Sequence, residues 1–150
     1  MIKKKSIKTK FGWITAFESE GKIFKIKFGK EKKQTNSKVL VKLLRNLQKF
    51  SNLETKKIKA PYILKGNKIQ KKVWRELKKI KIGKTKSYGE IAKKHNLSPR
   101  YVGKICGQNN LLLLVPCHRV IRSDGSLGGF SSSGGLKLKK ELLKMETLWR

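Results

Sequence analysis

The chain has 150 residues, of which 39 are Lys or Arg and nine are Asp or Glu, so its formal net charge is +30 at pH 7. This length suits one domain, or one with a small appendage, and a hydrophobic fraction of 37% can build a core. The longest uncharged apolar run, Leu111 to Val115, is far shorter than the roughly 20 residues that span a bilayer. We expect neither a transmembrane helix nor a secretory signal, and we predict a cytoplasmic protein.

The excess of positive charge favours a polyanionic partner, because each phosphate that a protein neutralises releases a counterion. Nucleic acid is the first candidate and a membrane surface the second. The alternative is that Lys replaces other polar residues as a compositional habit of a hot-living or AT-rich organism. The two cysteines, Cys106 and Cys117, form no CxxC pair, and the two histidines lack metal-ligand spacing. The sequence therefore predicts no disulfide and no structural zinc.

The first 60 residues predict a small α+β domain. Residues 11–28 contain two β-rich runs around a glycine-containing turn, which indicates a hairpin, and its second run should present one apolar face made of Phe24, Ile26 and Phe28. Apolar residues then recur at helical spacing from 37 to 50, with Asn36 or Ser37 as the N-cap. Residues 51–68 are rich in loop formers, so we divide the chain into domains 1–60 and 61–150.

The second domain is predicted to be mostly helical. One helix begins at Asn67 or Lys68, and two short helices follow over residues 88–95 and 99–106, joined by a tight connection in which Ser98 is a good N-cap. This pair matches a helix-turn-helix, although a plain corner between two core helices is the alternative. Basic residues around the pair favour DNA: Lys93, Lys94, Arg100 and Lys104. After a Gly/Ser-rich loop at 123–135, a last helix is expected from about 136 to 147.

The segment 114–121, which reads LVPCHRVI, resembles the active-site signature of the O6-alkylguanine-DNA alkyltransferases. Four further blocks follow the order of that family, at 73–77, 87–92, 100–103 and 142–146, so that the resemblance covers residues 69–147. It implies that Cys117 accepts an alkyl group from O6 of a damaged guanine in double-stranded DNA, once per molecule and without a cofactor. Thiolate is the protein nucleophile best suited to such a displacement.

The same resemblance implies the roles of the other site residues. His118 is the base that activates Cys117 through a water, and Glu146 orients His118, as the acid does in hydrolytic triads. Tyr88 donates to N3 of the extruded guanine, which stabilises the leaving base. Arg100 enters the duplex as a finger in place of the flipped nucleotide, with Tyr101 and Lys104 also on the DNA-binding helix.

The resemblance further implies a hinge at Asn109, which braces the turn before the active-site segment. The base pocket is expected to include Val120, Phe130 and Ser131, with Phe130 at a place where relatives often carry Tyr. Relatives dock the second helix of the helix-turn-helix in the minor groove, where sequence readout is weak. The partner is thus double-stranded DNA bearing O6-alkylguanine, bound by a monomer without an obligate protein partner and without a membrane.

Two other functions are open to the same sequence. A non-enzymatic protein of this fold could flip the damaged base and recruit other factors, but relatives of that kind lack the cysteine that is present here as Cys117. A Cys-His hydrolase would need an oxyanion hole, which no motif in the sequence supplies.

Overall fold

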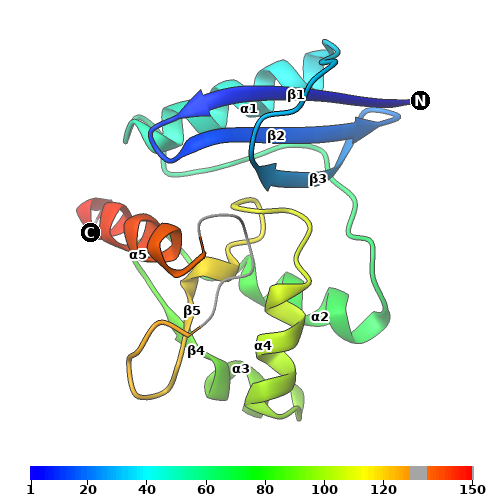
Figure 1. Ribbon diagram of the computed structural model, residues 1–150. Coiled ribbons are helices and arrows are strands. Elements are labelled where there is room, and N and C mark those ends of the chain that lie inside the picture. The colour runs from blue at the N-terminus through cyan, green and yellow to red at the C-terminus, as the bar shows by residue number, and fades with distance from the viewer. Residues whose placement is uncertain (129–134, 150) are drawn as a thin grey trace. The chain divides into compact units, whose positions relative to one another are not determined.

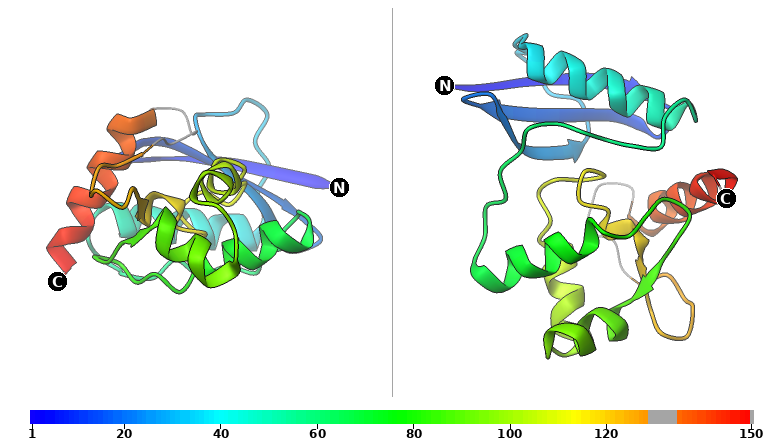
Figure 2. Two further views of the ribbon diagram at one scale, coloured as in Figure 1. Left: turned by 90° about the horizontal axis from the view of Figure 1, so that it is seen from below. Right: turned by 180° about the vertical axis from the view of Figure 1, so that it is seen from behind.

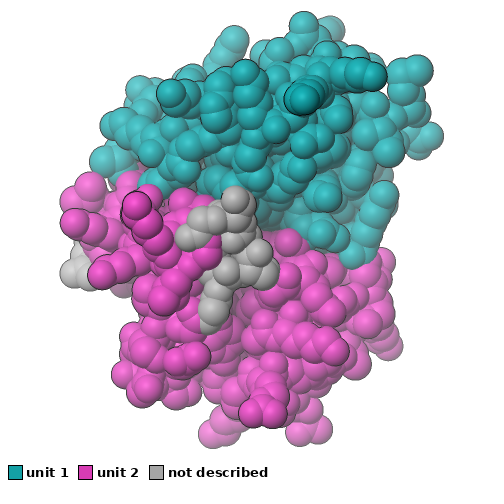
Figure 3. Space-filling view, viewed as in Figure 1, with its two compact units in different colours: residues 1–65, 110–114 teal, residues 66–109, 115–150 magenta. Residues whose placement is uncertain are grey.

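The computed structural model describes residues 1–128 and 135–149, and the chain divides into two units (Figure 3). Unit 1 comprises Met1–Lys65 and Asn110–Leu114, and unit 2 comprises Gly66–Asn109 and Val115–Arg150. The expected boundary at residue 60 differs from this division, because residues 61–65 and 110–114 group with the first unit. Each of these segments pairs with the last strand of the sheet, through bridges Ile23↔Tyr62 and Ile26↔Leu111.

Unit 1 is built on a three-stranded antiparallel sheet of order β1-β2-β3 (Figure 1). Its strands are β1 (Ile2–Thr9), β2 (Gly12–Ser19) and β3 (Lys22–Phe28). The predicted hairpin corresponds to β2 and β3, whose two-residue turn has positive φ at both Glu20 and Gly21, as type I′ turns require. The prediction missed β1, because the lysine-rich sequence IKKKSIKT shows no regular alternation of apolar residues.

The prediction that Phe24 shares a face with Ile26 and Phe28 was wrong. A β-bulge interrupts the register, since Phe17 pairs with Lys25 but the next residue, Glu18, pairs with Ile23. The extra residue reverses the side-chain alternation of the strand. Ile23, Ile26 and Phe28 are therefore buried, whereas Phe24 is half-buried and stacks near Phe17, with their ring centroids 6.1 Å apart.

One face of the sheet is covered by helix α1 (Lys38–Ser51), as the rear view in Figure 2 shows. Ser37 caps this helix, since its side chain accepts a hydrogen bond from the Leu40 backbone, so the second of the two predicted N-caps, Asn36 or Ser37, is the one used. Its apolar stripe is buried against the sheet and consists of Leu40, Leu43, Leu44, Leu47 and Phe50. The segment that connects β3 to α1 crosses the opposite face of the sheet.

Unit 2 begins with helix α2 (Lys68–Leu77), for which Asn67 and Gln70 form a capping box. The buried Trp74 of this helix donates a hydrogen bond from Nε1 to the Ile105 carbonyl at 3.1 Å. Helix α2 is thereby fixed to a later helix of the same unit, as expected for an aromatic residue whose polar atom must be satisfied inside a core.

The two predicted short helices are confirmed as α3 (Tyr88–His95) and α4 (Pro99–Gly107), which pack against each other. Ser87 caps α3 in a capping box with Glu90, and Asn96 ends that helix in the left-handed conformation, with φ of 57°. Ser98 caps α4 and Pro99 occupies its first position. These local signals place a tight turn between the two helices.

The remainder of unit 2 carries the cysteine segment. Strands β4 (Lys86–Ser87) and β5 (Val120–Ile121) form a short parallel pair, which the sequence analysis did not predict. The 3-10 helix η1 (Cys117–Arg119) precedes β5, and the last helix α5 (Gly135–Glu146) is followed by the 3-10 helix η2 (Thr147–Trp149). None of the helices within the described ranges is both long enough and apolar enough to cross a bilayer.

Candidate active site

Unit 2 contains a cavity of about 680 Å³, a size typical of small-molecule sites. Cys117 lies in its wall, together with residues of α3, of α4 and of the segment after β5. The lining side chains that carry chemistry are Tyr88, Arg100, Cys106, Cys117, Arg122 and Ser123. The cavity therefore brings two thiols, a phenol and two guanidinium groups to one place, although these residues come from three separate segments of the sequence.

Cys117 is only 6% exposed, and its backbone N–H donates to the Val115 carbonyl at 2.8 Å. Burial raises the pKa of its thiol, while a hydrogen bond from Asn109 and the positive charge of Lys139 act in the opposite direction. Burial also raises the pKa of the neighbouring thiol of Cys106 to about 12, helped by the proximity of Cys117. Both thiols are protonated at neutral pH, so nucleophilic attack by Cys117 requires a base.

The adjacent residue can serve as that base. His118 has no solvent exposure, and its Nε2 lies 2.6 Å from Oε2 of Glu146 at the end of α5. Burial lowers the pKa of His118 against the opposing effect of Glu146, so the ring is neutral at pH 7. Since Nε2–H donates to the carboxylate, Nδ1 is the unprotonated nitrogen, and it has no hydrogen-bond partner among the described residues. The ring can therefore accept a proton at Nδ1.

Glu146 is also held by a cation, Arg119, that the sequence analysis did not single out. Arg119 donates from Nε to Oε1 at 2.8 Å and from Nη2 to Oε2 at 2.9 Å. Burial of Glu146 opposes ionisation, but the bonds from His118 and Arg119 outweigh it and lower the pKa of Glu146 to about 2. A third donor of Arg119, Nη1, reaches the Ile80 carbonyl at 2.8 Å. This bidentate pairing fixes the carboxylate that in turn fixes His118.

The amide of Asn109 links two parts of the segment around Cys117. Its Nδ2 donates to the Val115 carbonyl at 2.8 Å and contacts Sγ of Cys117 at 3.3 Å. Asn109 thus lies at the predicted hinge position, between the end of α4 and the cysteine. The contact with sulfur adds a direct electrostatic effect on the thiol to the bracing role that was predicted.

Tyr88, which begins α3, has a buried basic partner. Lys139 of α5 has no solvent exposure, and its Nζ donates to the Tyr88 hydroxyl at 3.2 Å. Burial lowers the pKa of Lys139 and raises that of Tyr88 to about 12. Sequence reasoning missed Lys139. The sequence feature that could have indicated it is helical spacing: Lys139 lies three residues before Leu142 and seven before Glu146, and therefore on the buried stripe of α5.

Close packing around the phenol limits its movement. Gly128 has φ of 72°, and a Cβ at this position would lie 2.9 Å from Cε2 of Tyr88. A side chain is excluded here both by backbone conformation and by space. The position of the Tyr88 ring therefore depends on a glycine in the loop that follows β5.

The other predicted site residues are distributed as follows. Arg100 lines the cavity at the start of α4, and on the same helix Tyr101 is half-buried and Lys104 exposed. Val120 is fully buried in β5. Phe130 and Ser131 lie outside the described residues. In the ranges 1–128 and 135–149, no three His, Cys, Asp or Glu side chains are grouped so that they could hold a metal ion.

Comparison with known proteins gives concordant matches. Residues 68–148 match the model of the 6-O-methylguanine DNA methyltransferase DNA-binding domain. The methylated-DNA–protein-cysteine methyltransferase of Metallosphaera sedula is 35% identical over 149 residues, which are 97% of this chain and 94% of that protein. The enzyme of the same name from Methanocaldococcus vulcanius is 44% identical over 113 residues, which are 74% of this chain and 65% of that protein.

Solved structures give the same result at the level of the fold. The O6-methylguanine methyltransferase of Mycobacterium tuberculosis matches with a TM-score of 0.85 and 27% identity, over 99% of this chain and 94% of that one. A structure of the M. tuberculosis protein in complex with DNA matches with a TM-score of 0.86 and 27% identity, over 97% and 92%. The Methanococcus jannaschii O6-methylguanine DNA methyltransferase gives 0.72 and 31%, over 96% and 93%. The mixed α and β content expected from the sequence is thus confirmed, with a small antiparallel sheet and five α-helices in the described ranges.

Proposed function

Because this chain belongs to the O6-methylguanine DNA methyltransferase family, we propose that it repairs DNA by moving an alkyl group from O6 of guanine to Cys117. The transfer is irreversible, so each molecule acts once. The observation that carries the proposal is a thiol in the wall of a cavity of about 680 Å³, next in sequence to a neutral imidazole that is held by a carboxylate. No cofactor is required by this chemistry.

The proposed step balances with groups of this chain. The thiol proton of Cys117 passes through a water to Nδ1 of His118, and the resulting imidazolium is stabilised by Glu146. The sulfur then forms a bond to the alkyl carbon while the bond between that carbon and O6 breaks, and the electron pair goes to the guanine. Burial and Asn109 matter here in opposite ways, since burial disfavours the thiolate and the amide hydrogen bond favours it.

Tyr88 is proposed to donate to N3 of the departing guanine. Two observations support this role. Its pKa of about 12 keeps the phenol protonated, and Lys139 contacts its oxygen as a donor. An ammonium group only donates hydrogen bonds, so the proton of the phenol is directed to another acceptor. Negative charge that develops on the leaving base would thus meet a donor backed by a cation.

DNA is proposed to bind along α3 and α4, with α4 in the minor groove and the damaged nucleotide turned out into the cavity. The relative whose structure includes DNA supports a DNA ligand. Arg100 occupies the first turn of α4 and lines the cavity, so it can follow the flipped nucleotide into the duplex. Tyr101 and Lys104 would contact the backbone from the same helix, and Val120, Phe130 and Ser131 would complete the base pocket.

The decisive experiment is intact-protein mass spectrometry after mixing with a duplex that carries one O6-methylguanine. We expect a gain of one methyl group per protein, located on Cys117 by peptide mapping, and a repaired oligonucleotide in equal amount. Cys106→Ser is the matched control and should still be methylated, whereas Cys117→Ser should not react. Repeated turnover, an unmodified protein, or a methyl group on another residue would overturn the proposal.

A second experiment tests base flipping. Replacing Arg100 with Ala should slow repair of duplex DNA by about 10-fold or more, since filling the vacated stack offsets an unstacking cost of a few kcal/mol. Reaction with the free base O6-benzylguanine should be nearly unchanged, because it requires no flipping. Arg75→Ala, at an exposed position of α2, is the control for loss of one charge. Equal losses with both substrates would remove the finger role.

A further inference from the structure

Half of the charge excess lies in the unit that lacks the active site. Unit 1 holds 19 of the 39 basic residues and four of the nine acidic ones, which gives it a net charge of +15. None of the cavity-lining residues belongs to it. Because α1 covers one face of the sheet, the other face, which we call the outer face, is the surface to inspect for a charged ligand.

The outer face carries an aromatic pair with lysines above it. Phe17 of β2 and Phe24 at the bulge of β3 are both half-buried, with ring centroids 6.1 Å apart and planes tilted by 48°. Nζ of Lys25 lies 5.5 Å from the centroid of Phe17, and Nζ of Lys65 lies 4.3 Å from that of Phe24. The bulge creates this pair, because it turns Phe24 away from the core.

A shallow hollow of about 210 Å³ adjoins the pair. Its wall includes Phe24 and the exposed Ile63, and Lys65 and Lys22 lie at its edge together with Glu20. Aromatic and aliphatic surface is thus concentrated beside ammonium groups. Flat rings flanked by cations provide stacking and phosphate contacts in proteins that bind single strands.

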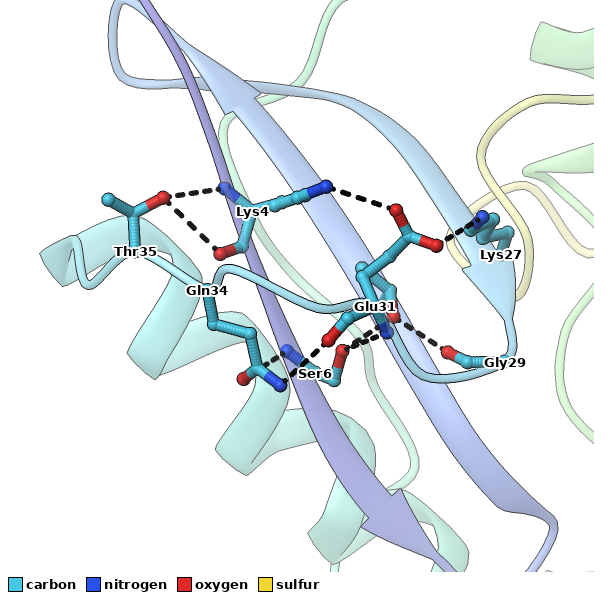
Figure 4. Close-up of polar contacts among 8 residues, drawn as sticks. Lys4, Ser6, Lys27, Gly29, Glu31, Gln34 and Thr35 are labelled. Atoms are coloured by element: carbon cyan, nitrogen blue, oxygen red, sulfur yellow. Dashed lines mark hydrogen bonds and ion pairs between the residues drawn. The ribbon is translucent and has the colours of Figure 1, made fainter.

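Another part of the outer face is crossed by the segment after β3 (Figure 4). Thr15 donates to the Gly29 carbonyl at 2.6 Å, and the Glu31 backbone donates to Ser6 Oγ at 3.1 Å. The carboxylate of Glu31 pairs with Lys4 at 3.1 Å and with Lys27 at 3.0 Å, so each of these two lysines has an acidic partner. In contrast, neither Lys25 nor Lys65 has an acidic partner in the part of the chain that the structure describes.

We propose that the Phe17–Phe24 pair and its flanking lysines form a binding surface for single-stranded nucleic acid. The bases stack on the two rings, and Lys25 and Lys65 leave the ring faces to contact phosphates. A duplex offers no free base faces, so it would use the lysines but not the rings. The surface is independent of Cys117, and its occupation requires no change in the chemistry proposed for unit 2.

The test uses the full-length protein and a fluorescent oligothymidylate of about 12 nucleotides, within the site sizes of known single-strand binders. Replacing both phenylalanines with leucine keeps an apolar body but removes the stacking faces. The double variant Phe17→Leu/Phe24→Leu should bind the oligomer at least about 10-fold more weakly, since the bases lose both rings on which they stack. Binding to an undamaged duplex and methylation of Cys117 should both stay at the wild-type level.

Charge is tested separately with a matched pair. Lys25→Glu/Lys65→Glu should weaken binding of the oligomer more than Lys42→Glu/Lys49→Glu, which makes the same charge change on exposed positions of α1. Photo-cross-linking with a bromodeoxyuridine oligomer should label peptides that contain Phe17 or Phe24. Thermal melting verifies that each variant is folded.

Four outcomes would overturn the proposal. Three of them are cross-links confined to unit 2, equal losses in the two charge variants, and unchanged affinity of a folded leucine variant for the oligomer. Equal weakening of single-strand and duplex binding by the leucine variant would likewise contradict it, because stacking would then not be the source of affinity. None of these results depends on whether Cys117 accepts a methyl group.

Discussion

Two carboxylates of this protein each bind two basic side chains, yet their surroundings give them different roles. Glu146 in unit 2 is 1% exposed and bonds to His118 and Arg119, while Glu31 in unit 1 is 28% exposed and pairs with Lys4 and Lys27. For both, the hydrogen bonds from these basic partners lower the pKa of the carboxyl group. At the surface, water screens each charge and competes for it, whereas a buried charge that loses its partner has no substitute.

The comparison shows that the number of partners does not measure the importance of an ion pair. Glu146 determines the tautomer of a ring beside the nucleophile, and its removal would leave Arg119 buried without its counter-charge. Glu31 holds a connecting segment against the sheet, and its lysines remain hydrated without it. Substitutions at the two carboxylates, and at the buried Lys139, test this contrast.

The largest effect is expected for Glu146→Gln. Breaking a buried pair by removing one partner costs about 3–5 kcal/mol, because the other charge stays buried. The free energy of unfolding from urea denaturation should fall by this amount, and single-turnover methyl transfer should slow at the same time. Glu141→Gln, an exposed residue of the same helix, is the control and should leave both values unchanged.

The pH dependence of the free energy of unfolding tests the direction of the pKa shift of Glu146. The pKa of Glu146 is about 2 in the folded chain, against an ordinary value of 4.5. Its ionised form therefore stabilises the fold above pH 4.5, and this contribution is lost as the pH falls towards 2. The stability difference between the wild type and the Gln variant should narrow across this window. If the stability difference between the two proteins did not change with pH, ionisation of Glu146 would not be its cause.

A smaller effect is expected for Lys139→Met. The ammonium group favours the Cys117 thiolate against burial, so its loss should raise the thiol pKa. One pKa unit corresponds to about 1.4 kcal/mol and to about a 10-fold slower alkylation by iodoacetamide at pH 7. The midpoint of the pH profile should move upward, a change that altered packing alone would not produce. Lys140→Met, exposed on the same helix, should retain the wild-type profile.

The smallest effect is expected for Glu31→Gln. Pairs of this exposure contribute little and are weakened by salt, so the melting temperature should stay within error of the wild type at physiological ionic strength. Any decrease should appear only at low salt. Glu20→Gln, at the exposed turn between β2 and β3, is the control. A salt-independent decrease as large as that of Glu146→Gln would contradict the distinction between the two carboxylates.

Much of the local structure followed from the sequence because it depends on nearby residues. Ser37, Asn67 and Ser98 each cap the helix that was predicted to begin after them, and the turn at Glu20 and Gly21 joins the predicted strands. The cysteine block and its resemblance to a family likewise needed no structure, since the order of short motifs along the chain carried it.

Tertiary structure alone decided what depends on contacts between distant segments. Three features arise from the pairing of one strand with another, which the residue pattern of a single strand does not encode. They are the bulge that turns Phe24 out of the core, the strand β1 and the bridge from β3 to Leu111. In the sequence, Lys139 and Arg119 are not distinguished from the other Lys and Arg residues; only the packed structure places them in contact with Tyr88 and Glu146. The sequence determines which side chains are charged. The strength of their interactions depends on the exclusion of water, and water is excluded only when the chain packs.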